Sequence, residues 1–272
     1  MPSLFAPVQN RRFSSALLLC IGLSLGACQS RNAALNADPL ETGSTGLAKT
    51  VAPGEQVASF KRTEALSQQW GANQGNVPLG LEYADNLQRM GQTEQQIEVL
   101  KTLAVAHPED GALQSKLGKQ LLGQGRAGEA TTMLERAAAA PGVDWKTLSA
   151  LGTAYDQQGN YAAARLKYQA ALALKPGDLA VENNMAMSFA LEGKLPDAEK
   201  LLRSASAQPG SDAQPRIRQN LALVVGLQGR FDEARSIASA DLPPDQVEAN
   251  LAFLQQMLSR PNTWAQLSQT KG

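Results

Sequence analysis

Few residues of this 272-residue chain could carry out covalent or metal chemistry. It has two cysteines, Cys20 and Cys28, and one histidine, His107. A zinc site needs several thiolate or imidazole ligands at set spacings, and an activated nucleophile needs a base within hydrogen-bond reach. Neither constellation stands out, and no G-x-x-x-x-G-K-[ST] phosphate loop occurs. We therefore expect no catalytic residue, no metal site and no cofactor. His107, just before Pro108, is expected to cap a helix or face solvent.

Cys28 is the residue with the clearest chemical role. Arg11 and Arg12 precede a mostly apolar run, residues 16–25, which leads into Leu-Gly-Ala-Cys at positions 25–28. About ten apolar residues are too few to span a ~30 Å hydrocarbon core, but they suit the core of a signal peptide. The segment resembles the lipobox of bacterial lipoproteins. That resemblance implies that residues 1–27 are a lipoprotein signal peptide and that Cys28 becomes a lipidated N-terminus. Gln29, in place of aspartate, implies sorting to the outer membrane and an anchor on its periplasmic side.

Two other interpretations of this segment stay open: an uncleaved signal anchor and an ordinary secreted protein. The paired arginines fit the charge of a signal peptide better than twin-arginine export, because the wider motif is not obvious. After cleavage Cys20 is lost and Cys28 is acylated, so no thiol remains for a disulfide or a metal. Removing Arg11 and Arg12 from 25 basic residues leaves 23 against 25 acidic residues, a net charge of −2. No concentrated basic stretch indicates nucleic acid binding.

The rest of the chain divides into a tether, a repetitive domain and a short tail. Residues 28–59, from the lipidated cysteine, are rich in small and turn-forming residues without a sustained period, so we interpret them as a flexible tether. Residues 60–260 form the predicted domain, and 261–272 a C-terminal tail. Within the domain, glycine recurs every 34 residues, at Gly91, Gly125, Gly159 and Gly193. A fixed period of this length indicates a helical repeat array.

The best copy of the repeat runs from residue 145 to 178. Its signature positions carry Leu148, Leu151, Gly152, Tyr155, Gly159, Tyr161, Ala164, Tyr168, Ala171 and Pro176. This pattern resembles the consensus of the tetratricopeptide repeat (TPR). Looser copies occupy 77–110, 111–144 and 179–212, and a fifth, 215–248, is shifted by two residues across a loop at 209–215. Lone capping helices are expected at 60–70 and 245–258. The resemblance implies an all-α fold, a TPR α-solenoid forming a right-handed superhelix with a groove.

The groove is the predicted functional surface, where the TPR family contacts partner proteins through the first helix of each repeat. Carried onto this sequence, those positions point to Lys119, Lys146, Thr153, Asp156, Asn183, Met187 and Gln219. Asn184 and Asn220 match an asparagine with which some repeats grip a peptide backbone. Lysine, amide and hydroxyl groups in this mixture favour an extended or helical peptide held by hydrogen bonds. The alternative is that each is an ordinary solvated residue.

Beyond the repeats, the segments 240–245 and 248–258 resemble the closing segment of the TadD family, the TPR lipoproteins of the Tad/Flp (tight adherence) pilus assembly system. The resemblance covers the lipobox, linker, repeats and tail. It implies a non-catalytic scaffold with protein partners, the outer-membrane secretin or companion pilus proteins, and with no nucleic acid or small-molecule substrate. Two alternatives remain. One is another outer-membrane TPR lipoprotein adaptor, related to type IVa pilotins or to outer-membrane protein insertion. The other is a regulatory accessory of a cell-wall enzyme.

Overall fold

The computed structural model describes residues 53–259, with side chains from Phe60 onward. The predicted signal peptide, Cys28, most of the 28–59 segment and the 261–272 tail lie outside the described residues. Export and lipidation therefore remain predictions. Within the described range the chain is helical and has no strand. The helices are α1 (Pro53–Ala72), α2 (Val77–Arg89), α3 (Thr93–Ala106), α4 (Gly111–Gly123), α5 (Ala127–Ala139), α6 (Trp145–Gln157), α7 (Tyr161–Leu174), α8 (Leu179–Leu191), α9 (Leu195–Ser206), α10 (Pro215–Leu227), α11 (Phe231–Ala238) and α12 (Pro244–Ser259).

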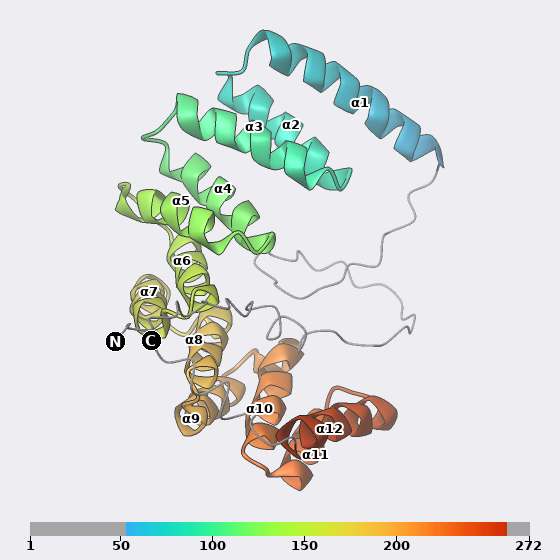
Figure 1. Ribbon diagram of the computed structural model, residues 1–272, viewed down its shortest axis with the longest axis vertical. Helices are drawn as coiled ribbons and strands as arrows, with labels where there is room; N and C mark the ends of the chain where they lie inside the picture. The colour runs from blue at the N-terminus through green and yellow to red at the C-terminus, as the bar shows by residue number, and fades with distance from the viewer. Residues whose placement is uncertain (1–52, 260–272) are drawn as a thin grey trace, which may run out of the picture. The chain divides into compact units, whose positions relative to one another are not determined.

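The helices form five successive antiparallel pairs, from α2–α3 to α10–α11, with α1 and α12 at the two ends (Figure 1). The first helices begin at the residues where the sequence repeats begin: Val77, Gly111, Trp145, Leu179 and Pro215. α1 occupies the place of the lone helix expected at 60–70 and extends beyond both of its ends. Each pair packs on the next, so every repeat buries apolar surface against its neighbours, as a solenoid requires. These described helices form an all-α TPR solenoid.

Three aspartates at the repeat interval start the first helices. Asp110, Asp144 and Asp178 are the N-cap residues of α4, α6 and α8, and each side chain accepts a backbone N–H of the first turn. Such caps satisfy donors that have no partner within the helix. The series stops before α10, where the expected loop at 209–215 contains a short 3₁₀ turn, Ser211–Ala213. The two-residue shift of the fifth repeat is thus absorbed outside the helices.

The recurring glycine ends the first helix of each pair. Gly159 has φ +75°, a left-handed conformation that costs glycine least, and Gly91, Gly125 and Gly193 share it. The N–H of the next residue, Asn160, then reaches back to the carbonyl of Tyr155 at 2.9 Å. The chain reverses within a few residues, which brings the second helix alongside the first.

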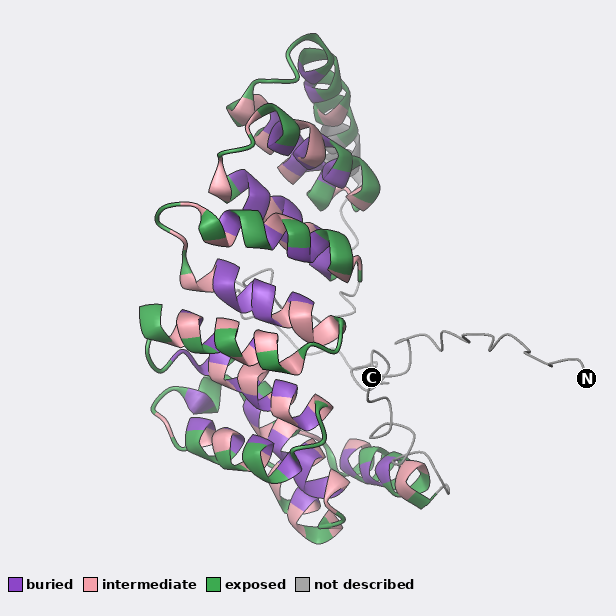
Figure 2. Cartoon of the chain, turned by 60° about the vertical axis from the view of Figure 1, so that its left-hand side comes forward, coloured by how far each residue is buried: buried purple, intermediate pink, exposed green. Residues whose placement is uncertain are grey.

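Small residues set the distance between paired helices in the third repeat. A Cβ added to Gly152 on α6 would lie 2.6 Å from Cε1 of Tyr168 on α7. Ala164 and Ala171 of α7 are fully buried on the same face. Along the array, the second helices have a buried side and an exposed side, whereas every residue of the first helix α6 is buried or half-buried (Figure 2). The apolar core therefore runs the length of the described domain.

We predict that Ala164→Leu destabilises the domain by about 1–3 kcal/mol. Ala164 has no exposed surface, so the added carbons must displace the facing helix. Ala162→Leu is the matched control, because Ala162 lies on the same helix and is exposed. Urea denaturation followed by far-ultraviolet circular dichroism measures both variants. Equal stability of the two variants would contradict the close packing of α6 on α7.

No helix in the described range is long and apolar enough to cross a membrane.

Candidate partner-binding face

The expected contact residues lie on four consecutive first helices. Lys119 is on α4, Lys146, Thr153 and Asp156 are on α6, Asn183, Asn184 and Met187 are on α8, and Gln219 and Asn220 are on α10. α4 contacts α6, α6 contacts α8, and α8 contacts α10, so the structure brings these residues onto one side of the array. We call the side formed by α2, α4, α6, α8 and α10 the first-helix face. In Figure 1 α6 and α8 lie to the right of α7.

Lys119 and Lys146 are half-buried and lie near the N-cap aspartate of α6. Burial raises the pKa of the Asp144 carboxyl, but the hydrogen bonds from Thr147 and the two nearby ammonium groups outweigh it. The pKa of Asp144 is therefore below its ordinary value. Nζ of Lys146 is also 5.5 Å from the centroid of the Trp145 ring. These lysines make the start of α6 a locally cationic part of the first-helix face.

The side chains of Asp156 and Thr153 form hydrogen-bond contacts with other side chains of the protein. Asp156 accepts a hydrogen bond from the hydroxyl of Tyr168 on α7 at 2.8 Å and another from Ser188 on α8 at 2.6 Å. Thr153 Oγ1 lies 3.2 Å from the same Tyr168 hydroxyl. Burial raises the pKa of Asp156 to about 6, and the two hydroxyl donors and Arg165 oppose this shift. Asp156 therefore joins the third repeat to the fourth.

Asn183 and Asn220 also contact each other. The Asn220 side chain donates to Oδ1 of Asn183 at 2.8 Å, which ties α8 to α10. Asn183 is only 5% exposed, so little of its surface is open to a partner. Asn220 is half-buried.

The remaining three expected residues differ in exposure. Met187 is half-buried and packs against the apolar core formed by α8–α12. Asn184 is half-buried, and Gln219 is exposed. Among the nine expected residues, Gln219 therefore offers the most accessible surface. Whether any of them binds a partner remains a prediction.

The sequence patterns did not reveal the polar contacts that join neighbouring repeats. Ser115 of α4 is 2.7 Å from Thr147 of α6, and Lys116 of α4 donates to Asp85 of α2 at 2.7 Å. Each pair is separated by close to one repeat length, as are Asp156 and Ser188. The sequence signal that could have predicted these contacts is a pair of polar residues about 32 positions apart on successive first helices. Some of the polar side chains on the first-helix face thus form hydrogen bonds between neighbouring repeats.

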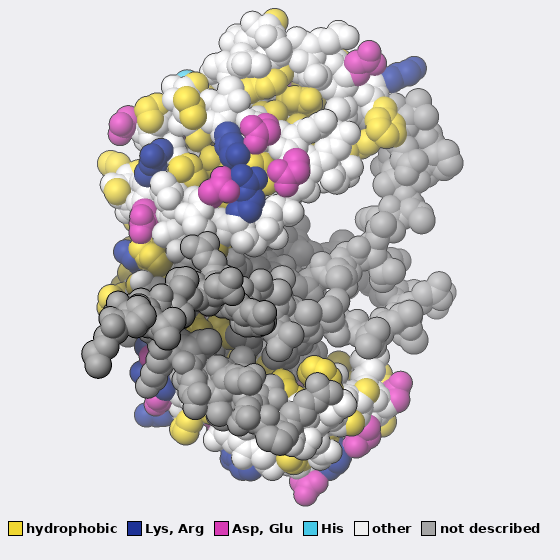
Figure 3. All heavy atoms as spheres, in the orientation of Figure 1, with side chains coloured by type: hydrophobic (Ala, Val, Ile, Leu, Met, Phe, Trp, Pro, Cys, Tyr) yellow, Lys and Arg dark blue, Asp and Glu magenta, His cyan; other side chains and the backbone are white. Residues whose placement is uncertain are grey.

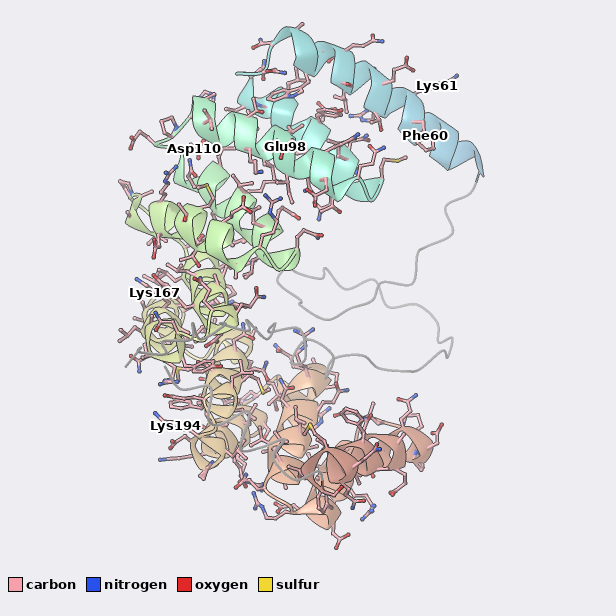
Figure 4. The ribbon with its side chains drawn as sticks, viewed as in Figure 1. Phe60, Lys61, Glu98, Asp110, Lys167 and Lys194 are labelled. Atoms are coloured by element: carbon pink, nitrogen blue, oxygen red, sulfur yellow. The ribbon has the colours of Figure 1, made fainter. Side chains whose placement is uncertain are left out.

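A separate cavity lies at the N-terminal end of the array. It has a volume of about 510 Å³ and is lined by residues of α1–α3 and the turn before α3: Phe60, Lys61, Thr63, Glu64, Ser67, Tyr83, Gln92 and Gln95. Figure 4 labels Phe60 and Lys61 on α1. None of the expected contact residues lines this cavity. In the described part of the chain, no group of three or more histidine, cysteine or acidic side chains is placed to hold a metal ion. His107 is the C-cap residue of α3, and its Nε2 is 2.9 Å from the carbonyl of Gly75.

Comparison with known proteins agrees with the fold. The tetratricopeptide repeat family model matches residues 115–179, which covers α5, α6, α7 and most of α4. A comparison with curated proteins found no match. TPR-fold proteins are typically non-catalytic scaffolds that bind other proteins.

Three solved structures illustrate the likeness. PilW, described as a widely conserved type IV pilus biogenesis factor, has a TM-score of 0.59 and 17% identity, over 72% of this chain and 92% of that chain. A tetratricopeptide repeat protein from Parabacteroides merdae has a TM-score of 0.54 and 13% identity, over 74% and 79%. YrrB, described as a TPR protein with an unusual peptide-binding site, has a TM-score of 0.53 and 16% identity, over 71% and 99%. At these identities the likeness shows the fold.

Proposed function

We propose that this protein is a lipid-anchored, non-catalytic TPR scaffold for pilus assembly, of the TadD kind. In this proposal Cys28 carries the acyl chains and holds the domain at the periplasmic face of the outer membrane. The first-helix face then binds the outer-membrane secretin or a companion Tad pilus protein. The observation that carries the proposal is the TPR solenoid behind a lipobox-like segment, with polar side chains gathered on four consecutive first helices.

Two further observations favour this function. The fold is shared with PilW, which is itself a pilus biogenesis factor. The closing segment at 240–258 resembles the TadD family. The anchor would raise the local concentration of the domain at the membrane. Two or more acyl chains bind a bilayer stably, whereas a single chain binds reversibly. The alternative functions are another outer-membrane TPR lipoprotein adaptor and a regulatory accessory of a cell-wall enzyme.

Site-specific photo-crosslinking in cells tests the partner and the face together. A photo-reactive amino acid at Gln219 is expected to crosslink to the secretin or another Tad component, because Gln219 is the most exposed of the expected contacts. The same amino acid at Val105, which is 81% exposed on the second helix of the first repeat, is the matched control and is expected to give no such product.

The anchor is tested by repeating the Gln219 experiment in a Cys28→Ala background. We expect the crosslink to weaken when the protein is no longer held at the membrane. Crosslinks from Gln219 only to β-barrel insertion or cell-wall machinery would overturn the Tad assignment and favour one of the alternatives.

A further inference from the structure

The outer side of α7 differs from the outer side of the other second helices. Ala162, Leu166, Ala170 and Leu174 follow one another at intervals of four residues and form a single apolar ridge over the length of the helix. Leu166 is 65% exposed and Leu174 is 55% exposed. Residues four apart on a helix share a face, so the ridge is continuous and about 18 Å long. It faces away from the first-helix face, and we call it the α7 ridge.

At the places that correspond to Leu166 and Ala170, the second helices before and after α7 carry polar or charged side chains. On α5 the exposed residues are Gly128, Thr132, Arg136 and Ala139 together with two glutamates, and on α9 they are Pro196, Asp197, Lys200, Arg203 and Ser204. Farther up the array, lysine and arginine side chains intermingle with acidic ones (Figure 3). Several of these are paired, as Arg126 is with Glu129 at 2.7 Å and Lys101 with Glu98 at 3.0 Å. An exposed apolar ridge between charged neighbours is the pattern of a docking surface.

Three cations surround the α7 ridge without an ion-pair partner in the described part of the chain. Lys167 follows Leu166 on α7 and is labelled in Figure 4. Arg136 on α5 precedes Ala170 by one repeat length of 34 residues, and Lys200 on α9 follows Leu166 by the same interval. In the repeat register Arg136 and Lys200 therefore occupy, on the second helices before and after α7, the places that Ala170 and Leu166 occupy on α7. α7 itself contains no acidic residue.

We propose that the α7 ridge is a second docking surface, distinct from the first-helix face, for an amphipathic helix of another protein with acidic residues flanking its apolar stripe. The apolar stripe packs on Leu166 and Leu174, as helix ridges pack into grooves. The flanking carboxylates lie against Arg136, Lys167 and Lys200. Charge complementarity of this kind selects the partner and its orientation.

Two other occupants fit less well. A second copy of this chain would bring α7 against α7, which places the two Lys167 side chains near each other, and α7 itself carries no acidic residue to offset them. An anionic bilayer would also contact the exposed carboxylates of Glu135 on α5 and Asp197 on α9, which lie on the same outer side. A single helix is narrow enough to contact the ridge and its three cations and to leave these carboxylates in solvent.

Fluorescence anisotropy with a synthetic probe tests the proposal. The probe is a capped helical peptide with leucines at intervals of four residues and glutamates on both flanks. A version with lysine in place of every glutamate is its control. The full chain is held in zwitterionic nanodiscs, and empty nanodiscs give the background. We expect the glutamate peptide to bind and the lysine peptide to bind at least about tenfold more weakly.

Variants of the chain locate the binding. The double variant Leu166→Glu/Leu174→Glu is expected to weaken binding about tenfold or more, because it removes both apolar contacts and adds like charge. Val105→Glu, an exposed apolar residue of α3, is the matched control and is expected to bind as the unaltered chain does. All three positions are exposed, and equal unfolding midpoints verify that each chain is folded.

Three results would overturn the proposal: unchanged affinity of the double variant, equal binding of the two peptides, or equal loss in Val105→Glu. Sedimentation that shows a dimer dissociated by Leu166→Glu/Leu174→Glu would assign the ridge to a second copy instead. Quenching of a fluorophore at Leu166→Cys by a quencher in phosphatidylglycerol nanodiscs would assign it to the bilayer. None of these outcomes depends on which protein contacts Gln219.

Discussion

Replacing Tyr168 by alanine is expected to lower the free energy of unfolding by about 3–5 kcal/mol. Tyr168 is 1% exposed, and its ring fills the space between α6 and α7 that Gly152 leaves open. Its truncation leaves a cavity at the centre of the array and also removes the hydroxyl that donates to Asp156. The core on which the ring packs includes residues of α6, α7 and α8, so we expect the loss to weaken two repeats.

The variant Tyr168→Phe separates the contribution of the ring to stability from that of the hydroxyl. It keeps the packing and removes the hydrogen bond to Asp156 and the contact with Thr153, so its cost is expected to be about 1–3 kcal/mol, below that of the alanine variant. Urea denaturation followed by circular dichroism measures both. If Tyr168→Ala unfolds within 1 kcal/mol of the unaltered protein, the central position of this ring in the fold is wrong. A larger cost for Tyr168→Phe than for Tyr168→Ala would contradict the division between packing and hydrogen bonding.

Stability is expected to rise by about 1 kcal/mol through Asp156 when the pH falls from 7.5 to 5.0. Burial raises the pKa of its carboxyl from 3.8 to about 6 in the folded protein, against opposing hydrogen bonds from Ser188 and Tyr168 and the charge of Arg165. Between these two pH values the folded state binds the proton more tightly than the unfolded state does. The contribution is therefore complete below about pH 4 and is lost as the pH rises through about 6.

Among the ionisable groups close to Asp156, Asp156 itself is the main one expected to titrate between pH 7.5 and 5.0. From α7 it faces Tyr161, Arg165 and Tyr168, and burial raises the pKa of both tyrosines above their ordinary value. From α8, Glu192 lies near Arg165, at 2.8 Å, and Tyr161. Burial opposes the ionisation of Glu192, but its contacts with Lys194 and Arg165 keep its pKa below the ordinary value. The pKa of Glu192 is thus displaced away from the pH range of the test.

Asp156→Asn removes the titrating group while it keeps the shape of the side chain. We expect the unaltered protein to gain about 1 kcal/mol relative to this variant between pH 7.5 and 5.0. Asp197→Asn, at an exposed carboxylate of α9, is the matched control and should follow the unaltered protein at both pH values. Parallel pH profiles for the unaltered protein and Asp156→Asn would show that Asp156 titrates at an ordinary value.

Much of the architecture follows from short-range features of the sequence. The 34-residue interval between Gly91, Gly125, Gly159 and Gly193 located the turns, and all four adopt the left-handed conformation. The first helices start at the predicted repeat boundaries because each start depends on a local signal: a side-chain cap from Asn76, Asp110, Asp144 or Asp178, or a proline at Pro215. Capping, turn formation and helical periodicity involve residues only a few positions apart, so the chain specifies them without reference to the rest of the fold.

The tertiary structure alone decided which polar residues of the first helices are available to a partner. By resemblance to the TPR family, Asp156, Asn183 and Gln219 were equivalent candidates for contact with a partner. In the folded chain, Ser188 and Tyr168 enclose Asp156, Asn220 holds Asn183, and Gln219 stays exposed. The partners of these two buried residues lie on neighbouring helices, up to 37 positions away for Asn183 and Asn220. The exposure of a side chain depends on which helix packs over it, and that is set by the stacking of repeats. Likewise, the α7 ridge could be recognised only once the folded chain showed which residues of α5, α7 and α9 stay exposed.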